Sequence, residues 1–291
     1  APAIDVLGGL PATANTQADA AVVETEQVRA ELLLDAPQGW QVGQPLRLGL
    51  KLQHTQGWHT YWKNSGDSGS PIRLKWQLPP GAAAGDVAWP VPQRIPVADM
   101  VNYGYAQDVL LSVPITISQQ PPADAKIVLD AQWLVCRIEC VPQQGHFELP
   151  IPTAGVSSEH AAFAQSLRAV PVPAPIGQTL TASLDGQHIV LQAQPPALRG
   201  FQGKTLTVFA EEAQYIDHAA AAQQSWQGAA WRLRLPLNPS IHTSPARTFW
   251  VLSDGKTALR ISAQMDAAQI AKLQASQLYQ RNTQGMSVPP A

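Results

Sequence analysis

The chain has 291 residues, of which 45% are hydrophobic and 14% charged, and its formal net charge is −2. This length and composition are typical of one or two globular domains with an ordinary core. The weak net charge, without any lysine- or arginine-rich run, argues against nucleic acid and anionic membranes as partners. The sequence also contains no apolar run of about 18 residues, the length that predicts a membrane-spanning helix.

Residues 1–22 are small, polar and without a pattern, so we expect a flexible leader. The chain starts with Ala-Pro-Ala-Ile-Asp-Val, without a basic segment followed by an apolar one. Such a start is typical of the mature end that signal-peptide cleavage leaves. We therefore expect a secreted protein.

A first series of short strands is expected within residues 23–155. Leu46, Leu48, Leu50 and Leu52 alternate strictly with other residues, which predicts a half-buried strand. The chain has 26 prolines and 20 glycines, many of them in turn-forming segments between similar apolar runs. Those further candidate strands are residues 28–36, 72–78, 109–117, 126–135 and 146–152. Short strands with frequent turns predict an antiparallel β-sandwich.

Residues 156–177 are expected to join this domain to a second one. Ser157–Val170 is the best helical segment, and a serine at its start is a good cap. Pro171–Gly177 is typical of a stiff, extended linker. Beyond it, alternating segments with an Asp185-Gly186 hairpin turn predict a second β-sandwich over residues 178–291. The segment 266–282 is compatible with a terminal helix or with an unstructured tail.

The chain has two cysteines, Cys136 and Cys140, separated by three residues. In one straight strand they would lie about 13 Å apart, too far for a disulfide, whereas on a helix they would lie about 6 Å apart. The flanking segments are strand-like, so we expect the chain to reverse direction between the cysteines. Directly opposed residues in an antiparallel pair have Cα atoms about 4.5–5.5 Å apart, within the disulfide range.

Three interpretations of the pair remain open. A structural disulfide is common in secreted proteins, but closing a loop of about five residues stabilises the fold by only about 2 kcal/mol. A short ring is also easier to reduce, which favours a redox-active disulfide. A metal site would need further ligands; His59 and His146 are candidates, but no Cys/His spacing resembles a zinc motif, so no metal is expected.

The segment Gly66–Pro71, Gly-Asp-Ser-Gly-Ser-Pro, resembles the sequence around the nucleophilic serine of trypsin-like proteases. In that family the serine lies late in the chain, after a histidine in an Ala-Ala-His-Cys segment and a separate aspartate. Here Ser68 lies early, and the nearby upstream His59 is in a different context. Turn chemistry explains the glycines, Asp67 and Ser68 without catalysis.

Gly57–Asn64, Gly-Trp-His-Thr-Tyr-Trp-Lys-Asn, has the alternation of a strand. His59 and Tyr61 would share one face, and Trp58, Thr60 and Trp62 the other. One face can enter the core while the other lines a site, although from this segment alone an ordinary amphipathic strand is the favoured interpretation. Ala98–Asp108 is expected to be a loop that either covers a disulfide or only connects strands.

Together these segments resemble the amino-terminal periplasmic domain of the DsbD/ScsB family of transmembrane thiol–disulfide reductases. The resemblance covers Leu32–Pro152 and rests on the order and spacing of several motifs. They are LKLQHTQGWHTYWKN, WQLPPG, NYGYAQDVLLSVPITI, CRIECVP and ELPIP. The insertion SGDSGSPIRLKW and the added second domain resemble the ScsB branch more than DsbD.

The resemblance implies an immunoglobulin-like sandwich, so we expect an all-β chain with two immunoglobulin-like antiparallel domains joined by a short helix and a proline-rich linker. It also implies electron transfer from a membrane-embedded domain of the same polypeptide to periplasmic thioredoxin-fold proteins. By motif position, Cys140 corresponds to the cysteine that forms the mixed disulfide and Cys136 to the cysteine that resolves it. The resemblance implies neither a metal nor a small-molecule cofactor.

Further residues are expected to line the disulfide. His59 and Tyr61 fall where the DsbD domain has two aromatic residues beside its cysteines. The DsbD cap loop has an acidic residue and a phenylalanine before a Tyr-Gly pair, and here Asp99 and Asn102 precede Tyr103. The leading hypothesis is therefore a periplasmic thiol–disulfide interchange module. The alternative is a secreted two-domain binding module with a structural disulfide.

Overall fold

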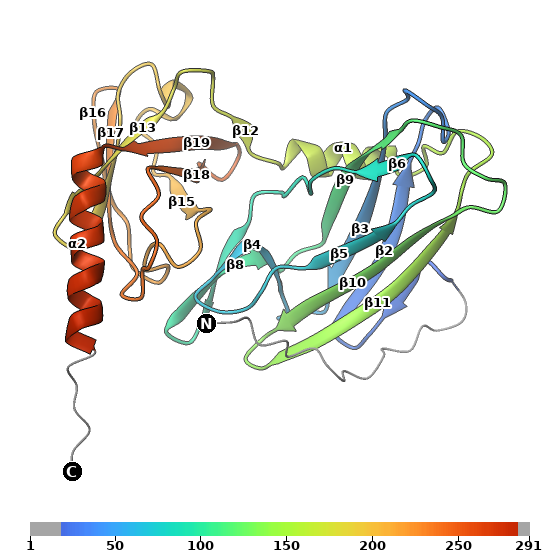
Figure 1. The fold of residues 1–291 in the computed structure, drawn as a ribbon, viewed down its shortest axis with the longest axis horizontal. Helices are drawn as coiled ribbons and strands as arrows, with labels where there is room; N and C mark the ends of the chain where they lie inside the picture. The colour runs from blue at the N-terminus through green and yellow to red at the C-terminus, as the bar shows by residue number, and fades with distance from the viewer. Residues whose placement is uncertain (1–18, 285–291) are drawn as a thin grey trace, which may run out of the picture. The chain divides into compact units, whose positions relative to one another are not determined.

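The computed structural model describes residues 19–284, which form two compact units (Figure 1). The first consists of residues up to 97 and 102–170, and the second of residues 98–101 and 171 onward. Most elements in both are strands, so the predicted all-β class is confirmed. Of the expected leader, residues 1–18 lie outside the described residues, and the first strand begins at Val22.

Two facing sheets form the body of the first unit. The larger has the order β1 (Val22–Glu24), β2 (Val28–Asp35), β3 (Leu46–His54), β9 (Val109–Ile117) and β6 (Ala82–Ala84). The smaller has the order β11 (Cys140–Pro150), β10 (Lys126–Cys136) and β5 (Arg73–Gln77). Neighbouring strands in both sheets are antiparallel, as predicted.

The core of this unit follows the alternation in the sequence. Leu48, Leu50 and Leu52 of β3 are fully buried, as their period of two predicts. On β10, Ile127 and Leu129 are buried in the same way. Inward-facing aliphatic side chains from both sheets therefore fill the space between them, which is the arrangement of a β-sandwich.

Helix α1 (His160–Arg168) packs on the outer face of the larger sheet. Phe163 forms a small buried cluster with Leu33 and Leu110. Gly49 of β3 faces this cluster, and a Cβ there would meet the side chains of Leu110 and Phe163. A glycine at this position thus allows the helix to cover the sheet. The helix lies within the predicted segment, residues 157–170.

A third, small sheet has the order β4 (Thr60–Gly66), β8 (Met100–Tyr105) and β7 (Gln93–Val97). The expectation of a loop over residues 98–108 was therefore wrong for most of the segment. Gly104 explains the strand pairing: it lies opposite Tyr61, and a Cβ there would clash with the Thr60 carbonyl. Because glycine lacks that atom, the two backbones approach closely enough to pair.

The second unit has strands in the order β15 (Thr207–Ala210), β18 (Arg247–Ser253), β19 (Ala258–Met265), β13 (Leu180–Asp185), β14 (His188–Ala193), β17 (Ala230–Pro236) and β16 (Gln223–Gln227). Most pairs are antiparallel, but β19 pairs in parallel with β13 and with β12 (Val172–Pro173). Part of the predicted linker is thus a short strand.

A single hydrophobic core lies inside this second unit. Trp231, Trp250 and Tyr215 are its largest fully buried side chains. A short 3-10 helix (Arg199–Phe201) and helix α2 (Ala267–Gln284) complete the unit, and Leu273 of α2 is buried in the core. From residue 267 on, the segment 266–282 is therefore a terminal helix and not an unstructured tail.

Gly104→Ala should destabilise the first unit by about 2 kcal/mol, because an added methyl must separate β8 from the Thr60 carbonyl. Urea unfolding measures this change. Gly200→Ala is the control, since its added methyl meets nothing within 4 Å. Equal midpoints for both variants would show that the close approach of β4 and β8 has no energetic weight.

Candidate functional site

The two cysteines lie opposite each other where β10 ends and β11 begins. The register of this hairpin pairs Lys126 with Pro150 at one end and Cys136 with Cys140 at the other. The cysteines form a disulfide with a Cα–Cα distance of 4.1 Å. The Arg137 amide donates to the Glu139 carbonyl at 3.0 Å, which closes the three-residue turn. The predicted reversal of the chain is confirmed.

The two cysteines differ sharply in exposure. Cys136 is only 2% exposed, whereas Cys140 is an exposed residue. Ile138, at the tip of the turn, is 86% exposed. The Arg137 guanidinium lies over the Trp58 ring, 5.0 Å from its centroid, so one side of the turn rests on an aromatic surface. A protein that approaches the hairpin end therefore meets Cys140 and Ile138 before it meets Cys136.

His59 joins the disulfide to the small sheet through the backbone. Its amide donates to the Cys136 carbonyl at 2.9 Å, and the Cys136 amide donates to the His59 carbonyl at 3.0 Å. This isolated antiparallel bridge brings the start of β4 beside the end of β10. It explains why the aromatic strand, distant in sequence, borders the cysteines.

Side chains alternate along this strand as predicted. The rings of His59 and Tyr61 meet edge to face with centroids 5.2 Å apart, and the Tyr61 hydroxyl lies 4.0 Å from the Cys140 sulfur. Trp62 instead packs edge to face on Tyr103, at 6.1 Å. His59 and Tyr61 thus face the site, while the Trp62–Tyr103 pair belongs to buried packing.

Asn102 on β8 completes a buried polar cluster. Its side-chain nitrogen lies 3.1 Å from Nε2 of His59 and 3.4 Å from the Tyr61 hydroxyl. Its oxygen accepts a hydrogen bond of 2.8 Å from the Ser68 hydroxyl. Asn102 is 1% exposed, so these contacts satisfy a side chain that would otherwise be costly to bury.

Burial sets the protonation states of this cluster. It lowers the pKa of His59, so the ring is neutral at neutral pH and Nε2 can accept from the Asn102 amide. Burial also raises the pKa of Tyr61 to about 12, so its hydroxyl keeps its proton wherever a thiol titrates. A disulfide sulfur carries no hydrogen, so Tyr61 is the donor toward Cys140.

The remaining predicted residues lie elsewhere. Tyr103 is buried against Trp62, and Asp99 is exposed in the turn between β7 and β8, about 10 Å of strand from Asn102. His146 forms ion pairs with Asp130 at 2.6 Å and Glu148 at 3.1 Å, which raise its pKa. It lies on β11 six positions beyond Cys140, about 20 Å along the strand, so it does not act on the disulfide.

Reasoning from sequence missed the contact of Ser68 with the cluster. The turn Gly66–Pro71 was assigned only turn chemistry, and nothing in its composition indicates which side chain it meets. A bulge in β4 between Tyr61 and Gly66 places Gly66 opposite Asn102 and so brings the turn to the site. A bulge depends on pairing with a distant strand and has no local signal here.

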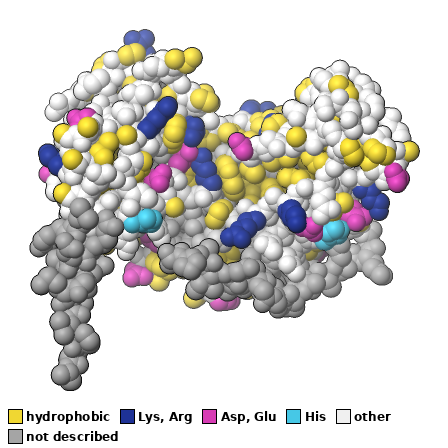
Figure 2. Space-filling model, in the orientation of Figure 1, with side chains coloured by type: hydrophobic (Ala, Val, Ile, Leu, Met, Phe, Trp, Pro, Cys, Tyr) yellow, Lys and Arg dark blue, Asp and Glu magenta, His cyan; other side chains and the backbone are white. Residues whose placement is uncertain are grey.

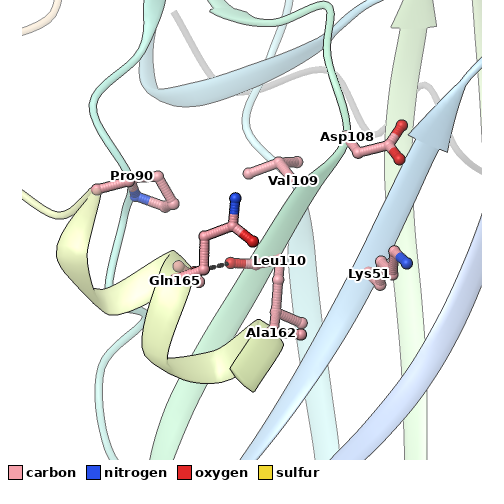
Figure 3. Close-up of a pocket in the computed structure, with 9 residues that line it drawn as sticks. Lys51, Pro90, Asp108, Val109, Leu110, Ala162 and Gln165 are labelled. Atoms are coloured by element: carbon pink, nitrogen blue, oxygen red, sulfur yellow. Dashed lines mark hydrogen bonds between the residues drawn. The ribbon is translucent and has the colours of Figure 1, made fainter. Parts of the chain in front are cut away.

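Within residues 19–284, no group of three or more His, Cys, Asp and Glu side chains could hold a metal ion. A cavity of about 350 Å³ lies between α1 and β9 (Figure 3). Lys51, Asp108, Leu110 and Gln165 are among its lining residues, and the Ser166 hydroxyl donates to the Leu110 carbonyl at its edge. Neither cysteine lines it, so it is separate from the disulfide site.

Charged side chains of both signs are interspersed on the surface in view (Figure 2). Lysine and arginine occur singly or in small groups there, with acidic side chains nearby. The face in view therefore carries charges of both signs without an extended positive patch. No helix in the described part of the chain is long and apolar enough to cross a membrane.

An immunoglobulin-like β domain with a partly exposed hairpin disulfide is the class of protein that the fold and the site define. Residues 24–152 match the family model described as the N-terminal domain of thiol:disulfide interchange protein DsbD. The first unit therefore contains a domain that matches the DsbD N-terminal family, which confirms the resemblance noted in the sequence.

A solved structure agrees at the level of the fold. The crystal structure of the N-terminal periplasmic domain of ScsB from Proteus mirabilis matches with a TM-score of 0.66 and 15% identity. The match covers 85% of this chain and 98% of that chain, so it extends into both units. A chimeric titin Z1Z2 functionalized with a peptide from decorin matches with a TM-score of 0.18 and 10% identity, over 83% of this chain and 97% of that chain. This TM-score is too low to indicate a shared fold. Among curated proteins, no sequence matches.

Stability should fall as the pH falls below 6.5, because His54 is half-buried beside β4 and desolvation lowers its pKa to about 4. The unfolded chain binds a proton there that the folded chain does not, so acid favours unfolding, by on the order of 2 kcal/mol at pH 5. His54 lies 3.0 Å from the Gln107 carbonyl and 2.9 Å from the Thr60 hydroxyl.

Urea unfolding at pH 7 and pH 5 measures this effect. His54→Gln should reduce the difference between the two midpoints, whereas His146→Gln should not, because the pKa of His146 is raised and its stabilising contribution is fully present below pH 6.5. An unchanged pH dependence in His54→Gln would rule out His54 as the group responsible.

Proposed function

We propose that this chain is a periplasmic thiol–disulfide interchange module that passes electrons through Cys136 and Cys140. The electrons come from a membrane-embedded domain of the same polypeptide and go to periplasmic thioredoxin-fold proteins. The observation that carries the proposal is a hairpin disulfide with one buried and one exposed cysteine, at the edge of a domain of the DsbD/ScsB family. The match to the periplasmic domain of ScsB supports the compartment.

The chemistry needs no cofactor. In the reduced domain, the Cys140 thiolate attacks one sulfur of the partner's disulfide, and the other partner cysteine leaves as a thiolate and takes up a proton. The Cys136 thiolate then attacks Cys140, which forms the Cys136–Cys140 disulfide and releases the second partner cysteine. Two electrons pass to the partner. Reduction by the membrane-embedded domain reverses these steps, with Cys136 leaving first.

The difference in exposure supports different roles for the two cysteines. An incoming sulfur must approach along the axis of the bond that breaks, which requires an accessible target. Cys140 is exposed and Cys136 is 2% exposed, so the partner bonds to Cys140 and Cys136 resolves the complex. The exposed Ile138 at the tip of the turn supplies an apolar contact beside Cys140.

The surrounding residues have supporting roles in this proposal. Tyr61 donates a hydrogen bond toward the Cys140 sulfur, and His59 supports both the Cys136 backbone and the Tyr61 ring. Asn102 fixes the two rings. Asp99 and Tyr103 are not included, because one is exposed in a turn and the other is buried against Trp62.

The second unit contains no cysteine, so it takes no direct part in the exchange. We assign it a structural or partner-docking role. The alternative for the whole chain, a secreted binding module with a structural disulfide, differs in one measurable property. Structural disulfides have reduction potentials below about −300 mV, whereas an exchanging pair lies higher.

The reduction potential of the Cys136–Cys140 disulfide should therefore lie above about −300 mV. Equilibration in buffers of reduced and oxidised dithiothreitol or glutathione, followed by maleimide labelling of free thiols, gives the value. A potential well below this limit would favour the binding-module alternative.

Partner trapping tests the roles of the cysteines. In Cys136→Ala the resolving thiol is absent, so a mixed disulfide through Cys140 should accumulate with a thioredoxin-fold protein that lacks its own resolving cysteine. In Cys140→Ala this complex should be scarce. Non-reducing electrophoresis and mass spectrometry identify the bond.

Both variants should remain folded, because the short loop contributes only about 2 kcal/mol. Loss of folding in both, with no complex in either, would contradict electron transfer and support a structural disulfide. Equal trapping by the two cysteines would leave the function in place and remove the assignment of roles.

A further inference from the structure

The turn Gly66–Pro71 contains no cysteine, yet it contacts the site through Asn102 and the Tyr61 ring. It follows β4 directly, and the bulge in that strand sets Gly66 across from Asn102. Two of its residues, Ser68 and Gly69, reach the buried cluster. Any effect of this contact on disulfide exchange rests on the proposed function.

Ser68 fixes the orientation of the Asn102 amide. Its hydroxyl donates to the Asn102 oxygen at 2.8 Å, so the amide nitrogen points the other way, toward His59 and Tyr61. An amide nitrogen has two hydrogens and only donates. Nε2 of His59 accepts one of these hydrogens and the Tyr61 oxygen accepts the other. The amide orientation that Ser68 fixes therefore determines the hydrogen bonds that both rings receive.

The Tyr61 hydroxyl therefore has a fixed direction. Its oxygen already accepts from Asn102, which leaves its own hydrogen for another acceptor. The Cys140 sulfur, at 4.0 Å, is that acceptor. The result is a continuous chain of donors from Ser68 through Asn102 and Tyr61 to Cys140.

Gly69 holds the Tyr61 ring by contact. The backbone of Gly69 has φ +91°, a conformation that favours glycine, and a Cβ there would overlap the Tyr61 ring. The His59 ring meets the same ring from another side, with centroids 5.2 Å apart. The turn thus limits both the position of the ring and the direction of its hydroxyl.

We propose that the Gly66–Pro71 turn is a positioning element: through Ser68 and Asn102 it holds the Tyr61 hydroxyl as a donor to Cys140 and thereby stabilises the Cys140 thiolate. The thiolate is the attacking group when the domain reduces a partner and the leaving group when the domain is itself reduced. A donor at this point raises the fraction of Cys140 present as thiolate in the first role and makes Cys140 a better leaving group in the second, since hydrogen bonds to charged groups are stronger than those to neutral ones.

The other ionisable groups near Cys140 do not duplicate this effect. Arg137 and Glu139 belong to the same turn as the cysteines and form an exposed ion pair at 3.6 Å, so their charges offset each other and are screened by water. His59 contacts Asn102 and Tyr61 with a neutral ring. Tyr61 is therefore the donor whose removal should be visible.

The test uses the full chain with Cys136→Ala, which leaves Cys140 as its one thiol. The rate of alkylation by iodoacetamide across pH gives the pKa of the Cys140 thiol. Tyr61→Phe should lower the thiolate fraction at neutral pH about tenfold, the usual effect of one hydrogen bond to a charged group. Ser68→Ala should lower it about threefold, since the donor is then present but less well directed.

Two controls separate positioning from general damage. Ser118→Ala removes an exposed hydroxyl just after β9 that bonds a glycine carbonyl, that of Gly81 at 3.0 Å, and should leave the profile unchanged. Ser68→Thr keeps a hydroxyl and should restore most of the thiolate fraction. In the Tyr61→Phe background, Ser68→Ala should add nothing, because Ser68 acts through Tyr61.

An unchanged alkylation profile in Tyr61→Phe overturns the proposal, and so does a Ser68→Ala effect that persists without the Tyr61 hydroxyl. If Ser68→Ala does not fold, the Tyr61→Phe profile alone decides. Partner trapping in the same variants keeps the two claims apart. If Cys140 still traps the partner but the alkylation profile does not change in the variants, only the positioning role is contradicted. If the parent Cys136→Ala protein traps no partner, the proposed function itself is contradicted.

Discussion

The site depends on one pair of backbone hydrogen bonds, those between His59 and Cys136 at 2.9 and 3.0 Å. They join the small β4–β8–β7 sheet to the end of the β10–β11 hairpin, between residues far apart in the sequence. Because side chains alternate along a strand, this single contact brings the His59–Tyr61 face to the cysteines and turns Trp62 toward Tyr103. The remaining polar contacts follow from that choice of face.

The same bridge makes the two cysteines unequal. Cys136 uses its amide and carbonyl to pair with His59 and is buried by that pairing, whereas Cys140 begins β11 and stays exposed. One geometric constraint therefore provides both features that exchange chemistry requires, an accessible sulfur for the partner and a protected sulfur for resolution. It also explains why a short disulfide of little value for stability can have a chemical use.

The strands and the hairpin disulfide could be predicted because their signals are local. Leucines at period two give β3, and two cysteines separated by three residues between strand-like segments require a reversal. The pairing of β4 with β8 could not be predicted, since it depends on Gly104 meeting the Thr60 carbonyl and on a bulge before Gly66. His59 and Tyr61 were expected at the site from the family motif, but no pattern connected Ser68 with Asn102.

The turn that resembles a protease motif illustrates the limit of motif reading. Gly-Asp-Ser-Gly is suited to a tight turn whatever the serine does, because the glycines permit unusual backbone angles and the short polar side chains bond locally. The function of the serine is set by what lies opposite it. Here that neighbour is a buried asparagine, not a histidine acting as a base, so the hydroxyl orients an amide. Two further hydrogen bonds, from Asn102 to Tyr61 and from Tyr61 to Cys140, connect this serine to the disulfide, and the sequence motif indicates neither of them.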